Sequence, residues 1–262
     1  MYLKRKIDSF LSEWKACQDR NPLVIKGARQ IGKTESIRHF AEENYENFIE
    51  IDFSLSEKFS RITDDGYDVE PIIKNITLID PSVEFIPGKT LLYFDNIQDD
   101  PNITTALKSF KINGRFDVIC SGSLLGINYK EIENNSVGYK TDYTMYSLDF
   151  EEFLWAKGYK QNMIDDMLCH IKETKPFSEL QHKVLSSLFF DYSVLGGMPA
   201  VVKEYIENNV FTGTLDIQRQ LMNDYKEDIR KYAQGLEQTK IISVFNSIPA
   251  QLAKENKKFQ CI

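Results

Sequence analysis

Eight consecutive residues near the N-terminus combine two glycines, a lysine and a threonine at a spacing suited to holding phosphate groups. They follow the apolar stretch Leu23–Ile25 and read Gly27-Ala28-Arg29-Gln30-Ile31-Gly32-Lys33-Thr34. Glycines let backbone N–H groups curl around phosphate oxygens, the lysine reaches the β- and γ-phosphates, and the threonine hydroxyl ligates Mg²⁺. A helix that follows directs the positive end of its dipole at the same anion. The segment predicts an ATP-binding P-loop. A glycine-rich turn without a ligand is the alternative.

Asp95 is the second candidate, because it ends the apolar run Leu91–Phe94. A P-loop needs a carboxylate that holds Mg²⁺ through its water shell, and an Asp at the end of a buried strand supplies it. Many strands also run into a turn that contains Asp. Together with the P-loop, however, the pattern predicts that Thr34 and Asp95 hold the metal.

In ATPases with an additional strand between the P-loop strand and the strand that ends in this Asp, the next residue is commonly a Glu that orients and polarises the attacking water. In this chain the residue is Asn96. An amide can hold water but cannot accept its proton, and a positioned base contributes about 10²- to 10⁴-fold in rate. We therefore predict that nucleotide binding is retained and that hydrolysis is slow or absent unless another group substitutes. Asp99 and Asp100 are interpreted as the start of the next helix.

A further apolar run ends in Cys120-Ser121-Gly122-Ser123. The hydroxyls of Ser121 and Ser123 would lie beside the γ-phosphate and could sense it by hydrogen bonding, although a Ser/Gly turn at a strand end is an equally simple reading. The predicted catalytic set is therefore Lys33, Asp95, Asn96 and Ser121, and the phosphate cradle is 27–34.

Five short apolar runs predict the strands that position these residues, and helical patterns separate them. The strands are Leu23–Ile25, Phe48–Phe53, Thr90–Phe94, Phe116–Cys120 and Tyr143–Leu148, and the helices cover 3–17, Lys33–Glu43 and Pro101–Phe110. Strands that alternate with helices indicate a parallel α/β sheet. The stretch Ser54–Gly88, with its Asp64-Asp65-Gly66 turn, is expected to be a loop-rich insertion.

After about residue 150 the apolar spacing is helical throughout. The expected helices are Phe150–Ala156, Gln161–Glu173, Phe177–Tyr192, Pro199–Glu207, Leu215–Tyr232 and Gln238–Lys254. We therefore predict a nucleotide-binding domain over 1–152 and an all-helical module over 153–262. Gly196-Gly197-Met198-Pro199 reads as a tight turn between helices, with a hinge or partner-contact loop as the alternative.

Composition excludes several classes of protein. The 262 residues carry a net charge of −7, which argues against a globally basic nucleic-acid surface, although a local patch such as Lys254–Lys258 stays open. No apolar run is long enough to span a membrane, and we expect a cytoplasmic protein. The cysteines, Cys17, Cys120, Cys169 and Cys261, lack zinc or disulfide spacing.

The motifs GARQIGKT, LLYFDNIQ, ICSGS, YSLDFEEFLWAKGY, LGGMP and IPAQLAKENKKF, in this order, span nearly the whole chain. By these motifs, the chain resembles a large family of prokaryotic AAA-like P-loop ATPases that carry a C-terminal domain of unknown function. The resemblance implies a sheet of order 5-1-4-3-2, with the magnesium Asp on the third strand and the sensing hydroxyl on the fourth. In that family Ile248–Phe259 would be followed by further helices, so the chain is expected to be C-terminally truncated and to self-associate through apolar surface.

Two departures from the family bear on turnover. The family usually has Asp-Glu-Ile-Gln where this chain has Asp95-Asn96-Ile97-Gln98, and Gly-Arg where this chain has Gly138-Tyr139-Lys140. A lysine point charge substitutes poorly for a guanidinium fork. The leading hypothesis is an ATP- and Mg²⁺-binding AAA-like protein with weak ATPase activity. The alternatives are a nucleotide-gated module for an unidentified protein or DNA partner, without turnover, and a P-loop kinase acting on a small acceptor.

Overall fold

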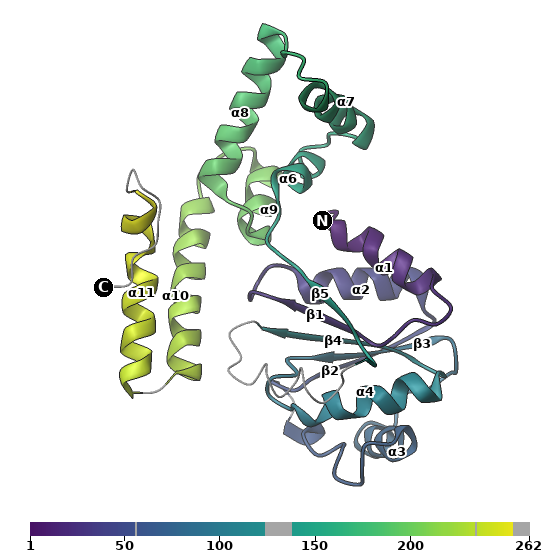
Figure 1. Cartoon of the computed structure of the whole chain (residues 1–262). Helices are drawn as coiled ribbons and strands as arrows, with labels where there is room; N and C mark the ends of the chain where they lie inside the picture. The colour runs from purple at the N-terminus through teal and green to yellow at the C-terminus, as the bar shows by residue number, and fades with distance from the viewer. Residues whose placement is uncertain (56, 124–137, 234, 254–262) are drawn as a thin grey trace. The chain divides into compact units, whose positions relative to one another are not determined.

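The computed structural model describes residues 1–55, 57–123, 138–233 and 235–253. The chain divides into two compact units, Met1–Thr214 and Leu215–Ile262. The first unit contains a sheet and the candidate site (Figure 1). The boundary after residue 152, between the nucleotide-binding domain and the helical module, stays a prediction.

The sheet consists of five parallel strands in the order β2-β3-β4-β1-β5. Their bounds are β1 Leu23–Gly27, β2 Asn47–Asp52, β3 Thr90–Asp95, β4 Asp117–Ser123 and β5 Thr141–Thr144. This is the order 5-1-4-3-2 read from the other edge, so the predicted topology is confirmed. Leu23 of β1 pairs with Ile119 of β4 on one side and Thr141 of β5 on the other.

Helices cover both faces of the sheet, which is why every residue of β1 and β3 is buried. On one face lie α1 (Lys6–Ala16) and α2 (Lys33–Asn44), and on the other α3 (Val69–Ile79) and α4 (Asn102–Asn113) (Figure 1). Successive side chains of β3 point alternately into the hydrophobic core under α1 and α2 and the core under α3 and α4. Leu91 and Tyr93 pack with α1 and α2, whereas Leu92 and Phe94 pack with α3 and α4.

Helix α3 corrects the expectation of a loop-rich insertion over Ser54–Gly88. Within that stretch Val69, Ile72 and Ile76 recur at helical spacing and are buried in the α3–α4 core. Pro71 does not break the helix because it lies in the first turn, where a backbone N–H has no intrahelical acceptor. A short 3₁₀ turn, Glu57–Phe59, precedes it.

The fifth strand is shorter than the predicted Tyr143–Leu148. Pairing with β1 ends at Thr144, after which the Met145 N–H still donates to the Lys26 carbonyl at 2.7 Å. The chain then leaves the sheet, and the Leu148 N–H donates to the Gly197 carbonyl at 2.7 Å. Residues 145–148 therefore join the sheet to the helices that follow.

The chain beyond β5 is helical, as predicted. The first unit continues with α6 Phe150–Ala156, α7 Gln161–Lys172, α8 Glu179–Leu195 and α9 Pro199–Asn208, and the second is formed by α10 Thr214–Tyr232 and α11 Gly235–Leu252. The expected end of the last helix at Lys254, the basic run Lys254–Lys258 and Cys261 lie outside the described residues. Over the described part of the chain, no helix combines the length and apolarity needed to cross a membrane.

Backbone packing fixes the turn before α9. A Cβ on Gly197 would lie 2.0 Å from the Leu148 carbonyl oxygen, and Gly196 has a φ of +69°. Pro199 occupies the first turn of α9, where its fixed φ suits a helix. The Gly-Gly-Met-Pro segment is thus a turn packed against the chain that leaves β5.

Candidate functional site

The predicted P-loop is a curled backbone segment between the end of β1 and the start of α2. Gly32 precedes the helix with a φ of +93°, and Gln30 has a φ of +61°. A Cβ on Gly27 would lie 2.4 Å from the Met145 carbonyl oxygen, so this position has room only for glycine. The left-handed residues reverse the chain and place the first N–H groups of α2 at the loop's centre.

Lys33 folds back over the loop. Its ammonium donates to the carbonyls of Gly27 at 3.0 Å and Ala28 at 2.6 Å. Burial, opposed by the Asp95 charge and assisted by nearby Arg29, lowers the pKa of Lys33 to about 8. The amine is therefore less stable as a cation here than in water, and an anion in the loop would favour its charged form.

Asp95 accepts hydrogen bonds from three donors at the carboxyl end of β3. Thr34 Oγ1 donates to Oδ2 at 2.9 Å, the Asn96 N–H donates to Oδ1 at 2.8 Å, and the Ser121 hydroxyl also donates to Oδ1. The structure thus brings together Thr34, Asp95 and Ser121 from α2, β3 and β4. A hydroxyl beside a carboxylate is a hard-oxygen donor set that fits Mg²⁺.

Tyr93 also belongs to this cluster and was not predicted. Its hydroxyl lies 2.9 Å from Ser121 Oγ and 3.3 Å from Thr34 Oγ1, and its side chain is fully buried. Burial, together with the Asp95 charge, raises the pKa of Tyr93 well above its usual value. Its signal in the sequence is a hydroxyl-bearing residue two positions before Asp95, on the same face of the strand.

Asn96 is turned toward the end of β2. Its φ of +55° is uncommon for a residue other than glycine, although Asn tolerates it. The side-chain amide donates to Asp52 Oδ1 at 2.9 Å and to Ser54 Oγ at 3.3 Å, and its oxygen accepts from Gln98 Nε2 at 3.0 Å. Asp52 was not among the predicted site residues, and its only signal in the sequence is that of an acidic residue at the end of an alternating strand.

Arg5 is a buried residue that connects the P-loop with the chain leading into α6, and it too was missed. Its guanidinium donates to the Ile31 carbonyl and the Tyr146 carbonyl, each at 2.7 Å, and to Glu152 Oε1 at 3.1 Å. Glu152 in turn completes a capping box with Asp149 at the start of α6. Nothing in the sequence pattern marked this arginine, because its partners are distant in the chain.

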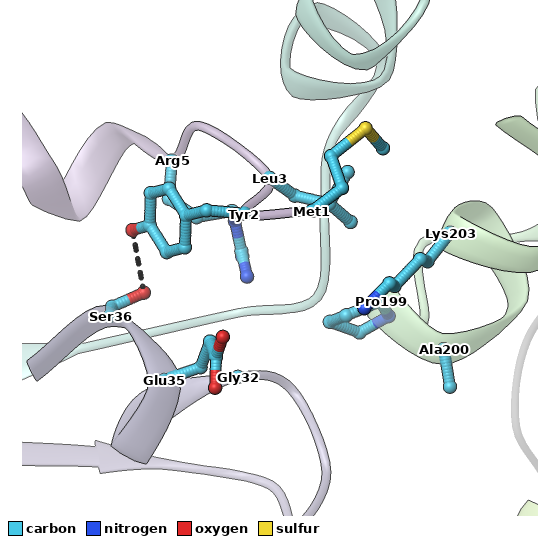
Figure 2. A pocket seen from close by; sticks show the side chains of 10 residues that line it. All are labelled: Met1, Tyr2, Leu3, Arg5, Gly32, Glu35, Ser36, Pro199, Ala200 and Lys203. Carbon is cyan, nitrogen blue, oxygen red and sulfur yellow. Dashed lines mark hydrogen bonds between the residues drawn. The ribbon is translucent and has the colours of Figure 1, made fainter. Parts of the chain in front are cut away.

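A pocket of about 180 Å³ adjoins the P-loop (Figure 2). Its walls come from the N-terminal segment, the first turn of α2 and the first turn of α9, and comprise Met1, Tyr2, Leu3, Arg5, Gly32, Glu35, Ser36, Pro199, Ala200 and Lys203. The Tyr2 hydroxyl donates to Ser36 Oγ at 3.3 Å, and the Tyr2 ring packs on His39 with centroids 3.9 Å apart. The pocket therefore combines an aromatic wall with charged side chains.

Of three other positions singled out in the sequence, Lys140 and Asp100 lie elsewhere, whereas Ser123 pairs with Gly27 at the start of the P-loop. Lys140 donates to Asp142 at 3.2 Å at the beginning of the edge strand. Asp100 accepts from the Asn102 N–H at 3.2 Å and lies two residues before the first residue of α4, next to its N-cap Pro101. The Ser123 N–H donates to Gln98 Oε1 at 3.3 Å.

Comparisons with known proteins agree with this architecture. A family model described as an AAA domain matches residues 19–154, just over half of the chain, and a domain of unknown function, DUF8612, matches residues 186–261. No curated protein matches the chain.

Solved structures similar to this chain include C. elegans PCH-2, with 9% identity and a TM-score of 0.38, over 66% of this chain and 48% of that one. Another is the Thermotoga maritima RuvB Holliday junction branch migration motor, with 14% identity and a TM-score of 0.38, over 58% of this chain and 48% of that one. The chain thus spans about half the length of these two proteins. By its match over residues 19–154, the chain belongs to the AAA domain family.

Proposed function

We propose that the chain binds Mg-ATP and hydrolyses it slowly. The observation that carries the proposal is the meeting of Thr34, Asp95 and Ser121 beside the curled loop that holds Lys33. Thr34 would ligate Mg²⁺, and Asp95 would hold its water shell. The backbone of 27–34 and Lys33 would bind the phosphates. The metal would neutralise phosphate charge, and Ser121 would sense the terminal phosphate.

The pocket beside Gly32 supports a nucleoside as the group attached to those phosphates. It shares Gly32 with the loop and offers the ring of Tyr2, on which a purine could stack (Figure 2). Glu35 gives it one acidic side chain, and Arg5 and Lys203 give it two basic ones, which suit hydrogen bonding with a base or a ribose. The proposed ligand therefore has its base in this pocket and its phosphates on the loop.

Slow hydrolysis follows from the chemistry of Asn96. Its amide cannot take a proton from water, and it is held by Asp52 and Gln98. Unless another group substitutes, the lack of a base at this position is expected to cost about 10²- to 10⁴-fold relative to an enzyme that has one there.

Binding and turnover can be tested separately. Calorimetric titration with Mg-ATP should show saturable binding that Lys33→Ala weakens strongly, and equal affinity in the two proteins would refute the site. In a phosphate-release assay, Asn96→Glu should exceed wild type. An Asn96→Gln variant is the matched control, since it has the same length without a base. No gain in Asn96→Glu would show that this position does not limit hydrolysis.

A nucleotide-gated interaction module is the second candidate. It is favoured by Arg5, which bonds both the P-loop and the start of α6, and by the pocket, whose walls include α9. A nucleotide in that pocket would contact both segments and could bias their arrangement for a protein or DNA partner. Tight ATP binding without turnover, together with ATP-dependent protection of α6 and α9 from hydrogen exchange, would favour this module over the ATPase.

A further inference from the structure

We propose that Asp52, at the carboxyl end of β2, supplies the carboxylate that activates water in place of the base missing at Asn96. The inference rests on the proposed function, because it assigns a role in ATP hydrolysis. It differs from the usual arrangement in placing the base on the neighbouring strand. In this chain the carboxylate lies on β2, and the amide, Asn96, directly follows β3.

The register of the sheet places Asp52 at the phosphate edge. Asp52 of β2 pairs directly with Asp95 of β3, so the two residues end their strands side by side. The Asn96 amide then closes the gap by donating to Asp52 Oδ1 at 2.9 Å. Asp52 is therefore held by the residue that occupies the usual position of the base.

One oxygen of Asp52 carries the hydrogen bonds that hold it. Oδ1 accepts from the Ser54 N–H at 2.8 Å, from Ser54 Oγ at 2.7 Å and from Asn96. Oδ2 takes part in none of these three bonds, and the Leu55 N–H is a further backbone donor to the carboxylate. Burial would raise the pKa of Asp52, but the bonds from Ser54 and Asn96 outweigh it and lower the pKa, so the group is ionised at neutral pH. Oδ2 is thus an oriented acceptor.

Part of this geometry is an ordinary turn, and a second turn in the same unit provides the comparison. Asp80 holds Ser82 in the same way, with its Oδ1 accepting from the Ser82 N–H at 3.0 Å and from Ser82 Oγ at 2.5 Å. Asp80 directly follows α3 and is half-buried, and among the described residues its side chain makes no hydrogen bond to the end of β3. The turn therefore explains the Ser54 bonds but not the bond between Asp52 and Asn96.

The reaction step balances without another reagent. Water attacks the γ-phosphorus, a new phosphorus–oxygen bond forms, and the bond between this phosphorus and the β,γ-bridging oxygen breaks. ADP leaves with the electron pair of that bond. Asp52 accepts the proton from the water and then releases it to solvent or to the phosphate product.

The test compares Asp52→Asn with Asp80→Asn, its matched control, in the full chain. Asp52→Asn should lower phosphate release by about 10²-fold or more while leaving Mg-ATP affinity within about twofold of wild type. Asp80→Asn should change neither. The exchanged pair, Asp52→Asn with Asn96→Asp, retains an amide next to a carboxylate and should recover turnover to within about tenfold of wild type.

A second readout uses binding alone. Wild type should bind ADP with aluminium fluoride, a mimic of the transferring phosphoryl group and its water, more tightly than ADP, and Asp52→Asn should lose that preference. Turnover by Asp52→Asn at the wild-type rate would overturn the proposal. The proposal would also be overturned if the wild-type protein bound Mg-ATP but neither hydrolysed it nor bound ADP with aluminium fluoride more tightly than ADP. Failure of wild type to bind Mg-ATP would instead refute the proposed function.

Discussion

Lys33 makes the affinity for ATP depend on pH in a way that can be calculated. In the free protein its pKa is about 8, chiefly because it is buried. A bound triphosphate favours the cation, so its pKa rises in the complex. Binding therefore takes up a proton wherever the pH lies above the pKa of the free protein and below that of the complex. By linkage, the affinity is highest near neutral pH and falls as the pH rises through 8.

The magnitude follows from the fraction of charged Lys33. In the free protein about nine-tenths of Lys33 is charged at pH 7, against about one-tenth at pH 9, so the dissociation constant should rise about tenfold, or about 1.4 kcal/mol. The terminal phosphate of ATP has a second pKa of about 6, so it is already ionised over most of the range from pH 7 to pH 9. Calorimetry in buffers of different ionisation enthalpy should count about 0.9 proton taken up per ATP at pH 9.

Lys33→Arg is the control, because a guanidinium stays charged throughout the range. Its binding is expected to be weaker, since the loop is fitted to an ammonium, but without the tenfold change between pH 7 and 9. A wild-type dissociation constant that stays flat over this range would refute the reasoning. An identical slope in Lys33→Arg would attribute the effect to another group.

Three further predictions concern neighbouring residues. Arg5→Ala should destabilise the protein by about 3–5 kcal/mol in urea unfolding, because it leaves the buried Glu152 carboxylate without its cation; a double variant with Glu152→Ala should recover part of the loss. Gly197→Ala should cost at least about 1–3 kcal/mol in the same assay, since its methyl group would meet the Leu148 carbonyl, and an unchanged midpoint would contradict that close approach. Thr34→Ala should make ATP affinity nearly the same with Mg²⁺ as with a chelator, whereas wild type should bind more tightly with Mg²⁺.

Local sequence patterns were sufficient to predict β3, which is buried on both faces, and the junction between β1 and α2. The run Leu91–Phe94 is apolar because helices cover both faces of β3, and the P-loop defines the β1–α2 junction. The strand order came from the family resemblance, since periodicity does not determine which strands are neighbours. Helix α3 was missed because its β-branched residues and Pro71 weaken a helical pattern that its burial in the core overrides.

The candidate site was predictable where chemistry follows sequence spacing and not where it depends on register. The Lys33–Thr34 pair is encoded in one loop, and Asp95 is recognisable as the end of a buried strand. Asp52 acquires its place only through the pairing of β2 with β3. Arg5 meets Glu152 across 147 positions of the chain, and no spacing rule reaches that far.

The position of β1 has a consequence for synthesis on the ribosome. This strand leaves the ribosome first, yet both of its neighbours come much later, since Leu23 pairs with Ile119 and Thr141. Until Thr144 has emerged, the backbone of β1 cannot be fully paired, and its apolar residues must be shielded by other means. The phosphate loop therefore cannot take its final form on a short nascent chain. The proposed binding of ATP would therefore stabilise the protein only once translation has passed the last strand.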